Sequence, residues 1–409
     1  MFYKEKTMKK HLLMTTLVGF AAIALTACGG KTEDTAKDIE EMATAARTMS
    51  DEELLAKAKT ESGKFLAYGN TSRIADAMKR FVAKYGTELG LNETTAVGSK
   101  LSDSQIYSSL TTEYTSRDNS NGASFVLVQD SATLANYRSQ TTMLTNYISD
   151  RFASNVDEGD LVPLAHQFIN KLFIWNNTKG EAAPKIKNVW ELTEEKFKGK
   201  IFFKSPESEQ VNLNFLITLT SPTWVSKMEA SYKEYFKRDF VKTEELKNAS
   251  YGWIKAFLEN ADTSSYTSDT KMAAGVSKET NADKIGLFVL SKLRDKSVTS
   301  ENLQVGAWTT EGITPFAGFM YSIYAQLASK GPRPYTAMLF TNYLMTEEGF
   351  APWKTAVGGY SSNKSIKEFE GDKPLNFYKQ NLVVEDGTYI NTVKTTMTDW
   401  INGLLKRAN

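Results

Sequence analysis

Four short polar segments carry the residues of this chain that could bind a ligand. Three of them follow an apolar run and precede a helical pattern, where free backbone N–H groups and the helix dipole favour an anion such as phosphate or carboxylate. Ser, Thr, Asn and Asp are also the preferred helix caps, so simple capping is the alternative interpretation. The candidate ligand-binding residues are Asn70, Thr71 and Ser72; Gln129, Asp130 and Ser131; Ser205, Glu207 and Ser208; and Trp308 and Glu311.

Acidic and aromatic residues in these segments leave the ligand type open. Glu207 and Glu209 suit a ligand hydroxyl or amine better than an anion, and Glu311 adds a third acceptor. Trp308 offers a flat apolar face for a sugar or an aliphatic group, although a core tryptophan is the simpler interpretation. His166 is a further candidate, in a segment expected to cross between lobes, where a structural histidine is the more common outcome.

The sequence lacks the motifs typical of catalysis and of metal binding. It contains neither a G-x-S-x-G elbow nor a G-x-x-x-x-G-K-[ST] phosphate loop. Ser361 and Lys364 match S-x-x-K, but no K-T-G partner accompanies them. With 2 histidines and 1 cysteine in the chain, a structural zinc site is not expected. We therefore expect a protein that is not an enzyme and needs no cofactor or metal, with an envelope hydrolase as the alternative.

The only cysteine, Cys28, indicates export and lipid attachment. A lysine-containing start and an apolar run of about 13 residues precede it, which is typical of a secretory signal and too short for a membrane span. The sequence Leu25-Thr26-Ala27-Cys28 resembles a bacterial lipobox, which implies diacylation of the cysteine. We expect a lipoprotein signal peptide over residues 1–27 and a flexible, lipid-anchored tether over residues 28–49.

Composition favours a large folded body without a nucleic-acid partner. The chain has 49 Lys and Arg against 48 Asp and Glu, so it lacks the basic excess of nucleic-acid-binding proteins. Hydrophobic residues make up 41% of the 409 residues, which is enough for a sizeable core and suggests two domains. A single cysteine leaves no disulfide to stabilise an exported chain, so stability must come from that core.

Short apolar runs alternate with helical patterns along the chain. The stretches "KFLAY", "SFVLVQD", "KLFIW" and "KIFFKS" predict buried strands. Ser50 and Glu53 predict a capping box at the start of a helix. Alternation of this kind indicates α/β layers around a largely parallel sheet. Further helices are predicted over residues 73–85, 211–219, much of 225–273, and 319–346.

Five stretches keep a consistent order between residues 53 and 362: "ELLAKAKTESGKFLAYGN", "AMKRFVAKYG", "GASFVLVQDSATL", "VWELTEEKFKGKIFFKSP" and "AMLFTNYLMTEEGFAPWKTAVGGYSS". Together they resemble the extracellular solute-binding proteins of ABC importers, in the group that includes ferric-iron, thiamine, phosphonate and sugar-phosphate binders. In the third stretch, Ser124 and Phe125 replace the family's usual aspartate and valine. The resemblance implies an α/β protein with the two-lobed periplasmic-binding-protein type II fold, a hinge and a ligand cleft between the lobes.

The resemblance also implies a domain plan and partners. Lobe 1 would comprise residues 50–165 and 286–345, and lobe 2 residues 166–285 and 346–409. The chain would act as a monomer that captures a small polar solute and delivers it to an ABC permease and ATPase. It would be held through the Cys28 lipid at the outer face of the cytoplasmic membrane or in the periplasm.

The ligand class stays open within this group. Ferric-iron binders carry an adjacent tyrosine pair after an Ile-Gly-Leu strand, whereas residues 285–293 contain no tyrosine, which argues against ferric iron. The loops rich in Ser, Thr and Asn favour a phosphorylated or carboxylated metabolite. A polyamine or a thiamine-like cation is the rival, favoured if Glu207, Glu209 and Glu311 all face the cleft. A surface adhesin that has lost transport is a further alternative.

Overall fold

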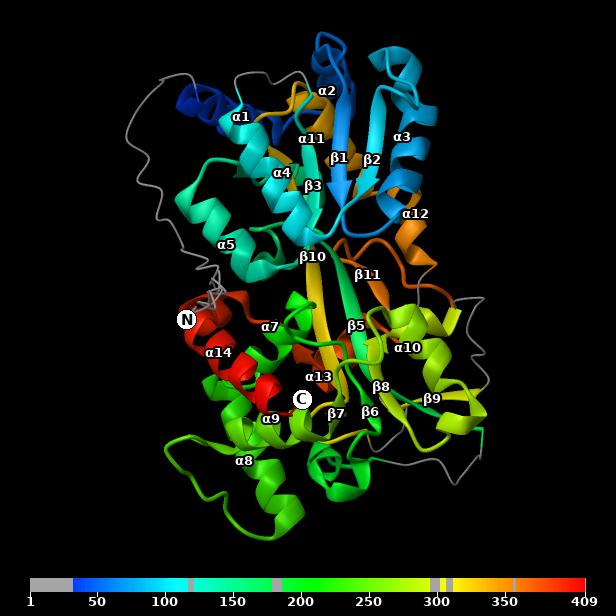
Figure 1. Ribbon diagram of the computed structural model, residues 1–409. Coiled ribbons are helices and arrows are strands. Elements are labelled where there is room, and N and C mark those ends of the chain that lie inside the picture. Colours follow the sequence, from blue (N-terminus) through cyan, green and yellow to red (C-terminus); the bar gives the residue numbers. More distant parts are fainter. Residues whose placement is uncertain are drawn as a thin grey trace, which may run out of the picture.

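The computed structural model describes residues 32–116, 121–178, 186–294, 302–306, 312–355 and 358–408, which form two lobes, one above the other in Figure 1. Lobe 1 holds strands β1 (Phe65–Gly69), β2 (Ala96–Lys100), β3 (Phe125–Val128) and β4 (Leu144–Thr145). Its helices are α1 (Thr32–Ala46), α2 (Asp51–Ala58), α3 (Arg73–Leu89), α4 (Asp103–Thr115), α5 (Ser131–Gln140), α6 (Asp150–Ala153), α11 (Pro334–Leu344) and α12 (Glu347–Lys354).

Lobe 2 contains the remaining helices and a second group of strands. The strands are β6 (Ile201–Phe202), β7 (Ala261–Asp262), β8 (Ile285–Val289), β9 (Leu303–Val305) and β12 (Val383–Val384). The helices are α7 (Gln210–Thr218), α8 (Pro222–Phe236), α9 (Ala249–Asn260), α10 (Asp269–Val276), α13 (Leu375–Asn381) and α14 (Gly387–Ala408). None of the helices in the described ranges combines the length and the apolar character needed to cross a bilayer.

Two long strands, β5 (Ala165–Asn176) and β10 (Gly318–Ala328), run through both lobes and join their sheets (Figure 1). The strand order is β2-β1-β3-β10-β5-β8-β6-β7, and the short strand β11 (Gly359–Ser361) pairs with β5. Neighbours are parallel at the outer ends of this order and antiparallel where β10 and β5 meet each other and their flanking strands. Each lobe is therefore a mostly parallel sheet, and β5 and β10 are the connection about which the lobes could move.

Aromatic side chains form the core of each lobe. Phe65, Phe81 and Phe340 pack within 5.1–5.9 Å of one another in lobe 1, measured between ring centroids. In lobe 2, Trp253 stacks on Phe257 at 4.5 Å. Buried aromatic pairs of this kind hold each lobe together as a packed body.

The structure confirms several of the predicted elements. Ser50 accepts a hydrogen bond from the Glu53 N–H, and the Ser50 N–H donates to the Glu53 carboxylate at 2.8 Å, which completes the capping box. Helix α3 begins at Arg73, as predicted. The run "KLFIW" is the end of the longer strand β5, all of whose residues are buried.

The prediction of helices over residues 319–346 is wrong for the first part of this range. Strand β10 occupies Gly318–Ala328, and only α11 is helical in the region predicted beyond it. Most of β10 is buried on both faces, so its apolar residues follow no period of two. Their spacing therefore resembled the apolar face of a helix.

The prediction of a flexible tether over residues 28–49 is wrong for the part that the structure describes, which is mostly helical. Residues 32–46 form α1, and Ile39, Ala43 and Ala46 are buried at helical spacing against lobe 1. Arg47, just after the helix, pairs with Asp150 at 2.9 Å. Polar composition concealed this narrow apolar stripe, because three small or aliphatic residues are enough to dock a helix. Cys28 lies outside the described residues.

The chain returns to lobe 1 later than the domain plan placed it. Strand β8 lies between β5 and β6 in the lower sheet, and β9 also pairs with β5, so both belong to lobe 2. The return to lobe 1 is made by β10, and α12 stays there, packed against α3 and α11. Sequence patterns could not locate this boundary, since the return occurs within a single strand.

Candidate functional site

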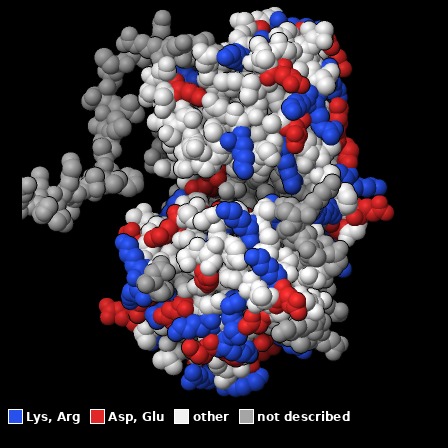
Figure 2. All heavy atoms as spheres, turned by 45° about the vertical axis from the view of Figure 1, so that its right-hand side comes forward, with Lys and Arg blue, Asp and Glu red and all other residues white. Residues whose placement is uncertain are grey.

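A cleft of about 780 Å³ separates the two lobes in front of the connecting strands. Figure 2 shows the surface hollowed at the waist between the lobes, with Lys and Arg side chains on the borders of the hollow. Both lobes and both connecting strands contribute to the lining. The volume lies in the range of small-molecule binding sites.

Four helices begin at this cleft. Helices α3 and α4 follow β1 and β2 in lobe 1, and α7 and α10 follow β6 and β7 in lobe 2. All four strands run parallel to their sheet neighbours, so their carboxyl ends and the following helix N-termini meet at the same place. The first residues of each helix line the cleft. This arrangement places the positive ends of four helix dipoles around the cavity.

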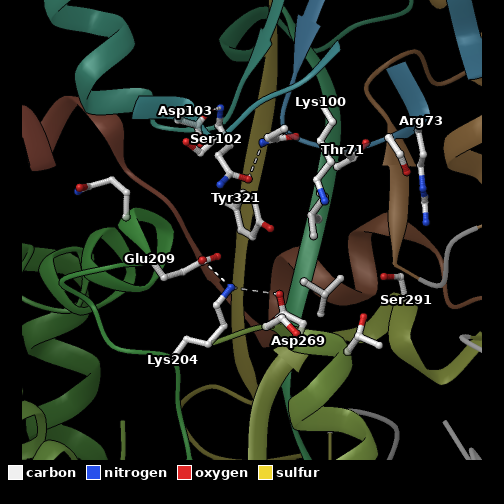
Figure 3. A pocket seen from close by; sticks show the side chains of 18 of the residues that line it. Thr71, Arg73, Lys100, Ser102, Asp103, Lys204, Glu209, Asp269, Ser291 and Tyr321 are labelled. Carbon is white, nitrogen blue, oxygen red and sulfur yellow. Dashed lines mark hydrogen bonds and ion pairs between the residues drawn. The ribbon is translucent and has the colours of Figure 1, made fainter. Parts of the chain in front are cut away.

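The wall contributed by lobe 1 holds two cations that have no acidic partner in the described part of the chain. The guanidinium of Arg73 makes one hydrogen bond, at 3.4 Å to the carbonyl of Trp353, and within the described residues no carboxylate lies in ion-pair distance of it. Burial lowers the pKa of Arg73, and the charge of Asp76 offsets part of that effect. Lys100 likewise makes no ion pair or hydrogen bond within the described part of the chain, and it points into the cleft (Figure 3).

The opposite wall carries carboxylates that are already paired. Lys204 lies 2.5 Å from the carboxylate of Glu209 and 3.5 Å from that of Asp269 (Figure 3). Burial by itself would raise the pKa of Glu209. The positive charges of Lys171 and Lys204 have the larger effect and lower this pKa to about 2. Burial also disfavours the charged form of Lys204, but Asp269 and Glu209 raise its pKa. Both groups are therefore ionised and mutually satisfied at neutral pH.

Asp103, at the start of α4, is a carboxyl group of the cleft with a raised pKa. Burial raises its pKa to about 7, although its carboxylate accepts a hydrogen bond from the Gln129 N–H at 3.1 Å. The negative charge of Asp130 adds to the increase. Since Asp103 lines the cleft, the negative charge in the cavity falls as the pH drops through about 7.

The floor of the cleft is formed by the connecting strands. Tyr321 of β10 points into the cavity (Figure 3), and Gln167 and Ile169 of β5 lie beside it. The Gln167 Oε1 atom is buried and has no hydrogen-bond partner within the described residues. Burial raises the pKa of Tyr321 far above its ordinary value, so its hydroxyl is a neutral donor. A ligand in the cleft would contact the strands that join the lobes.

The structure places half of the predicted residues in this cleft. Asn70 and Gln129 are joined by a hydrogen bond of 2.7 Å between their side chains. The hydroxyl groups of Thr71 and Ser72 have no hydrogen-bond partner among the described residues, and Ser72 makes no side-chain cap. The predicted residues that line the cleft are Asn70, Thr71, Ser72, Gln129, Glu207 and Ser208.

Other predicted residues lie elsewhere. Asp130 and Ser131 contact lobe 2 at a separate polar contact with α7 and α14. Ser205 does not line the cleft and instead accepts a hydrogen bond from the Glu207 N–H in its own turn. Trp308 and Glu311 lie outside the described residues.

His166 is buried in the core at the junction of the lobes. Its ring packs edge-on against Phe350 and Trp353, with centroids 5.3 and 4.8 Å away. Burial lowers the pKa of His166 to about 3, so the side chain is neutral. It lies on the opposite face of β5 from Gln167 and Ile169, because successive side chains of a strand alternate.

Several cleft residues were not predicted. Arg73 directly follows the predicted Asn70–Ser72 segment, and Lys204 directly precedes Ser205, so a wider window around each segment would have included them. Asp269 and Tyr321 gave no usable signal. The first begins a short helix with weak periodicity, and the second lies in the strand that had been predicted as a helix.

Metal-binding side chains do not gather anywhere in the described ranges, which contain no group of three or more His, Cys, Asp and Glu residues suited to an ion. Tyr321 is the only tyrosine among the described residues that line the cleft.

Comparison with known proteins shows the fold. No protein-family model matches the chain, and no curated protein matches it either. Iron-bound HitA from Pseudomonas aeruginosa superposes with a TM-score of 0.61 at 13% identity, over 84% of this chain and 99% of that one. The periplasmic binding protein AfuA from Actinobacillus pleuropneumoniae, with fructose-6-phosphate bound, superposes at 0.59 and 14% identity, over 84% and 99%.

The chain has the type II periplasmic-binding-protein fold. An ABC transporter protein from Clostridium perfringens has the same arrangement, with a TM-score of 0.55 and 15% identity over 85% of this chain and 100% of that one. The predicted fold class, with two α/β lobes and a cleft between them, is therefore confirmed. At such low identity the likeness concerns the architecture and says nothing of the ligand.

Proposed function

We propose that this chain is the substrate-binding component of an ABC import system and that it captures a small organic anion, such as a phosphorylated or carboxylated metabolite. One observation supports the anion above all. Arg73 and Lys100 face the cleft beside two helix N-termini without an acidic partner in the described residues, whereas Glu209 and Asp269 opposite them are paired with lysines. A ligand anion would supply the missing partner.

Charge in the cleft also weighs against the cationic rival. The expectation of a polyamine or thiamine-like ligand depended on glutamates facing the cavity. Of these, Glu209 is paired with Lys204, and Glu207 lies exposed at the rim. Among the described residues that line the cleft, the carboxyl groups left to oppose Arg73 and Lys100 are then those of Glu207 and of Asp103, whose pKa of about 7 leaves it partly neutral.

Capture would proceed by closure of the lobes about β5 and β10. Rotation would bring the N-termini of α3 and α4 toward those of α7 and α10, so that groups from both lobes contact one ligand. Closure excludes water and strengthens each polar contact. In this proposal the Cys28 lipid holds the protein outside the membrane, and the closed form docks on a permease that an ATPase drives.

The alternative of an envelope hydrolase finds little support. Ser361 Oγ accepts a hydrogen bond from the Asn363 N–H at 3.2 Å, while Lys364 pairs with Asp157 at 3.0 Å. The S-x-x-K match thus lacks the lysine–serine contact that would activate the hydroxyl. The proteins of similar fold are named as binding or transport proteins.

Native mass spectrometry of the protein purified from its own cells would test the proposal. We expect a bound metabolite with at least one phosphate or carboxylate group. A co-purifying ligand without any anionic group would overturn the proposal. A thermal-shift panel would extend the test, because a ligand at 100 times its dissociation constant adds about 2.7 kcal/mol to the free energy of unfolding.

Lipid attachment has a separate test. Metabolic labelling with a clickable fatty acid should mark the wild-type protein, and the Cys28→Ser variant should remain unlabelled. A label that persists in Cys28→Ser would show that the lipid is carried elsewhere.

A further inference from the structure

We infer that four charged side chains at the base of the cleft determine which sign of ligand charge the protein accepts. The four are Lys171, Glu209, Lys204 and Asp269, and we call them the charge ring. The inference rests on the proposed function because it concerns the same cleft. It adds the residues that decide between an anionic and a cationic ligand.

The charge ring is closed and alternates in sign. Lys171 Nζ lies 2.9 Å from one oxygen of Glu209, and the other oxygen of Glu209 lies 2.5 Å from Lys204 Nζ. Asp269 completes the ring, at 3.5 Å from Lys204 and 3.7 Å from Lys171. The four residues come from β5, from the segment between β6 and α7, and from the start of α10, so tertiary contacts assemble the ring.

The balancing charge of the ring is hidden from the cavity. Glu209, Lys204 and Asp269 line the cleft, which taken alone would make this wall acidic. The Lys171 side chain is fully buried beneath them, at 0% exposure, and Asn212 holds its ammonium at 3.0 Å. This buried lysine of a connecting strand makes the wall neutral overall. Arg73 and Lys100, which no described carboxylate pairs with, then dominate the electrostatic field in the cavity.

Lys204 is the member of the charge ring whose removal should change the accepted ligand charge from negative to positive. Its ammonium lies between Glu209 and Asp269 at the cavity surface, and its side chain is 10% exposed. One oxygen of Asp269 is already buried without a hydrogen-bond partner in the described residues. Replacing Lys204 with alanine would leave two carboxylates facing a space that a lysine side chain had filled. A primary alkylammonium ion matches that space in charge and in shape.

The decisive experiment measures amine binding by the Lys204→Ala variant. Wild-type protein, Lys204→Ala and Lys204→Arg are titrated with n-butylamine and 1,4-diaminobutane at fixed ionic strength, and thermal stability is followed. We expect both amines to stabilise Lys204→Ala saturably. The half-saturating amine concentration should be at least about tenfold lower for this variant than for wild type or Lys204→Arg. Lys200→Ala is the matched control, since Lys200 pairs with Asp283 outside the cleft.

A second substitution tests the charge balance itself. The double variant Lys204→Ala/Glu209→Gln has one carboxylate fewer, and we expect it to lose the amine binding that Lys204→Ala gained. Folded Lys204→Ala protein without any gain in amine binding over wild type would overturn the inference, as would an equal gain in Lys200→Ala.

If Lys204→Ala does not fold, the single variant Glu209→Gln tests the inference instead. It leaves an excess cation and should bind inorganic phosphate at least about tenfold more tightly than wild type, and unchanged binding would overturn the inference.

These outcomes are separate from the test of the proposed function. A cationic ligand on wild-type protein purified from its own cells would overturn the anion proposal, whatever the variants do. An anionic ligand on wild-type protein, together with no amine binding by Lys204→Ala, would overturn only the charge ring.

Discussion

Two of the polar places where the lobes meet behave in opposite ways. One is the cleft between the lobes, where we propose that the ligand binds. The other, which we call the seam, joins α5 of lobe 1 to α7 and α14 of lobe 2, on the left in Figure 1. Both begin at helix N-termini with the same kinds of residue, Asn70 to Ser72 at the cleft and Asp130 and Ser131 at the seam.

At the seam, side chains of lobe 2 bind the polar groups of lobe 1. Asp130 caps α5 by accepting from the Thr133 N–H at 3.2 Å, and its carboxylate pairs with Lys394 of α14 at 3.2 Å. Ser131 donates to Glu385, which also accepts from Asn214 at 2.9 Å. The partners that a ligand would supply are thus provided by lobe 2.

The cleft, in contrast, contains charged and polar groups that have no side-chain partner in the described part of the chain. Arg73 and Lys100 have no acidic partner among the described residues, and the hydroxyl groups of Thr71 and Ser72 make no hydrogen bond there. The difference shows that a polar helix N-terminus stays open to a ligand only when no other part of the fold covers it. We therefore expect substitutions at the cleft to change affinity and substitutions at the seam to change stability.

The largest effect is expected for Arg73→Gln, which should weaken binding of the anion found by native mass spectrometry at least about 100-fold. The variant removes the half-buried cation that faces the cavity. Its free energy of unfolding should stay equal or rise slightly, since an uncompensated buried charge is lost. Isothermal titration and urea denaturation measure the two quantities. Arg80→Gln, on the exposed side of α3, is the control, and an equal loss of affinity there would contradict a specific role for Arg73.

At the seam, Lys394→Met should lower the free energy of unfolding by about 2 kcal/mol and leave affinity within about twofold. It leaves the buried Asp130 carboxylate without its cation. Urea denaturation checks the first value and isothermal titration the second. Lys406→Met, at an exposed position of the same helix, should change neither. A large loss of affinity in Lys394→Met would show that the seam controls lobe closure.

The seam should also make stability depend on pH. Burial raises the pKa of Glu385 to about 8, the charge of Asp130 adds to this, and Ser131 and Asn214 oppose it. Because the folded state holds this proton more tightly than the unfolded state, the stabilisation is complete below about pH 4.5 and is lost as the pH rises to about 8. The slope for one such group is at most about 1.4 kcal/mol per pH unit.

Glu385→Gln removes that titration and should reduce the fall in unfolding free energy between pH 5 and pH 8 by about 1 kcal/mol or more. Urea denaturation at several pH values measures it. Glu368→Gln serves as a control, since Glu368 is exposed. An unchanged pH profile in Glu385→Gln would mean that the carboxyl is ionised in the folded protein at neutral pH.

The smallest predicted effect compares two serines at helix N-termini. Ser131→Ala should cost about 1 kcal/mol, because its hydroxyl donates to Glu385 inside the seam. Ser72→Ala should change stability by less than about 0.5 kcal/mol, because its hydroxyl makes no bond in the described structure. Thermal unfolding of both variants measures the difference. Equal costs would contradict the contrast between seam and cleft.

Local patterns in the sequence were sufficient for much of the architecture. The apolar run "KFLAY", the capping box of Ser50 and Glu53 and the helix from Arg73 all follow from short-range spacing, and the order of such stretches indicated the fold class. The same reasoning placed Asn70 to Ser72 at a cleft, because the carboxyl ends of parallel strands meet there.

Tertiary structure decided what the local patterns left open. Asp130 and Asn70 belong to similar segments, but α14, more than 250 residues further along the chain than Asp130, covers only Asp130. Glu209 suggested a cationic ligand until Lys171, from a distant buried strand, proved to balance it. In each case the deciding partner is remote in sequence and its charge acts only at contact distance. The sequence by itself therefore determined some of the segments that could bind a ligand. The packing of the two lobes determined which of these remain open and brought unpredicted residues such as Asp103 and Asp269 to the cleft.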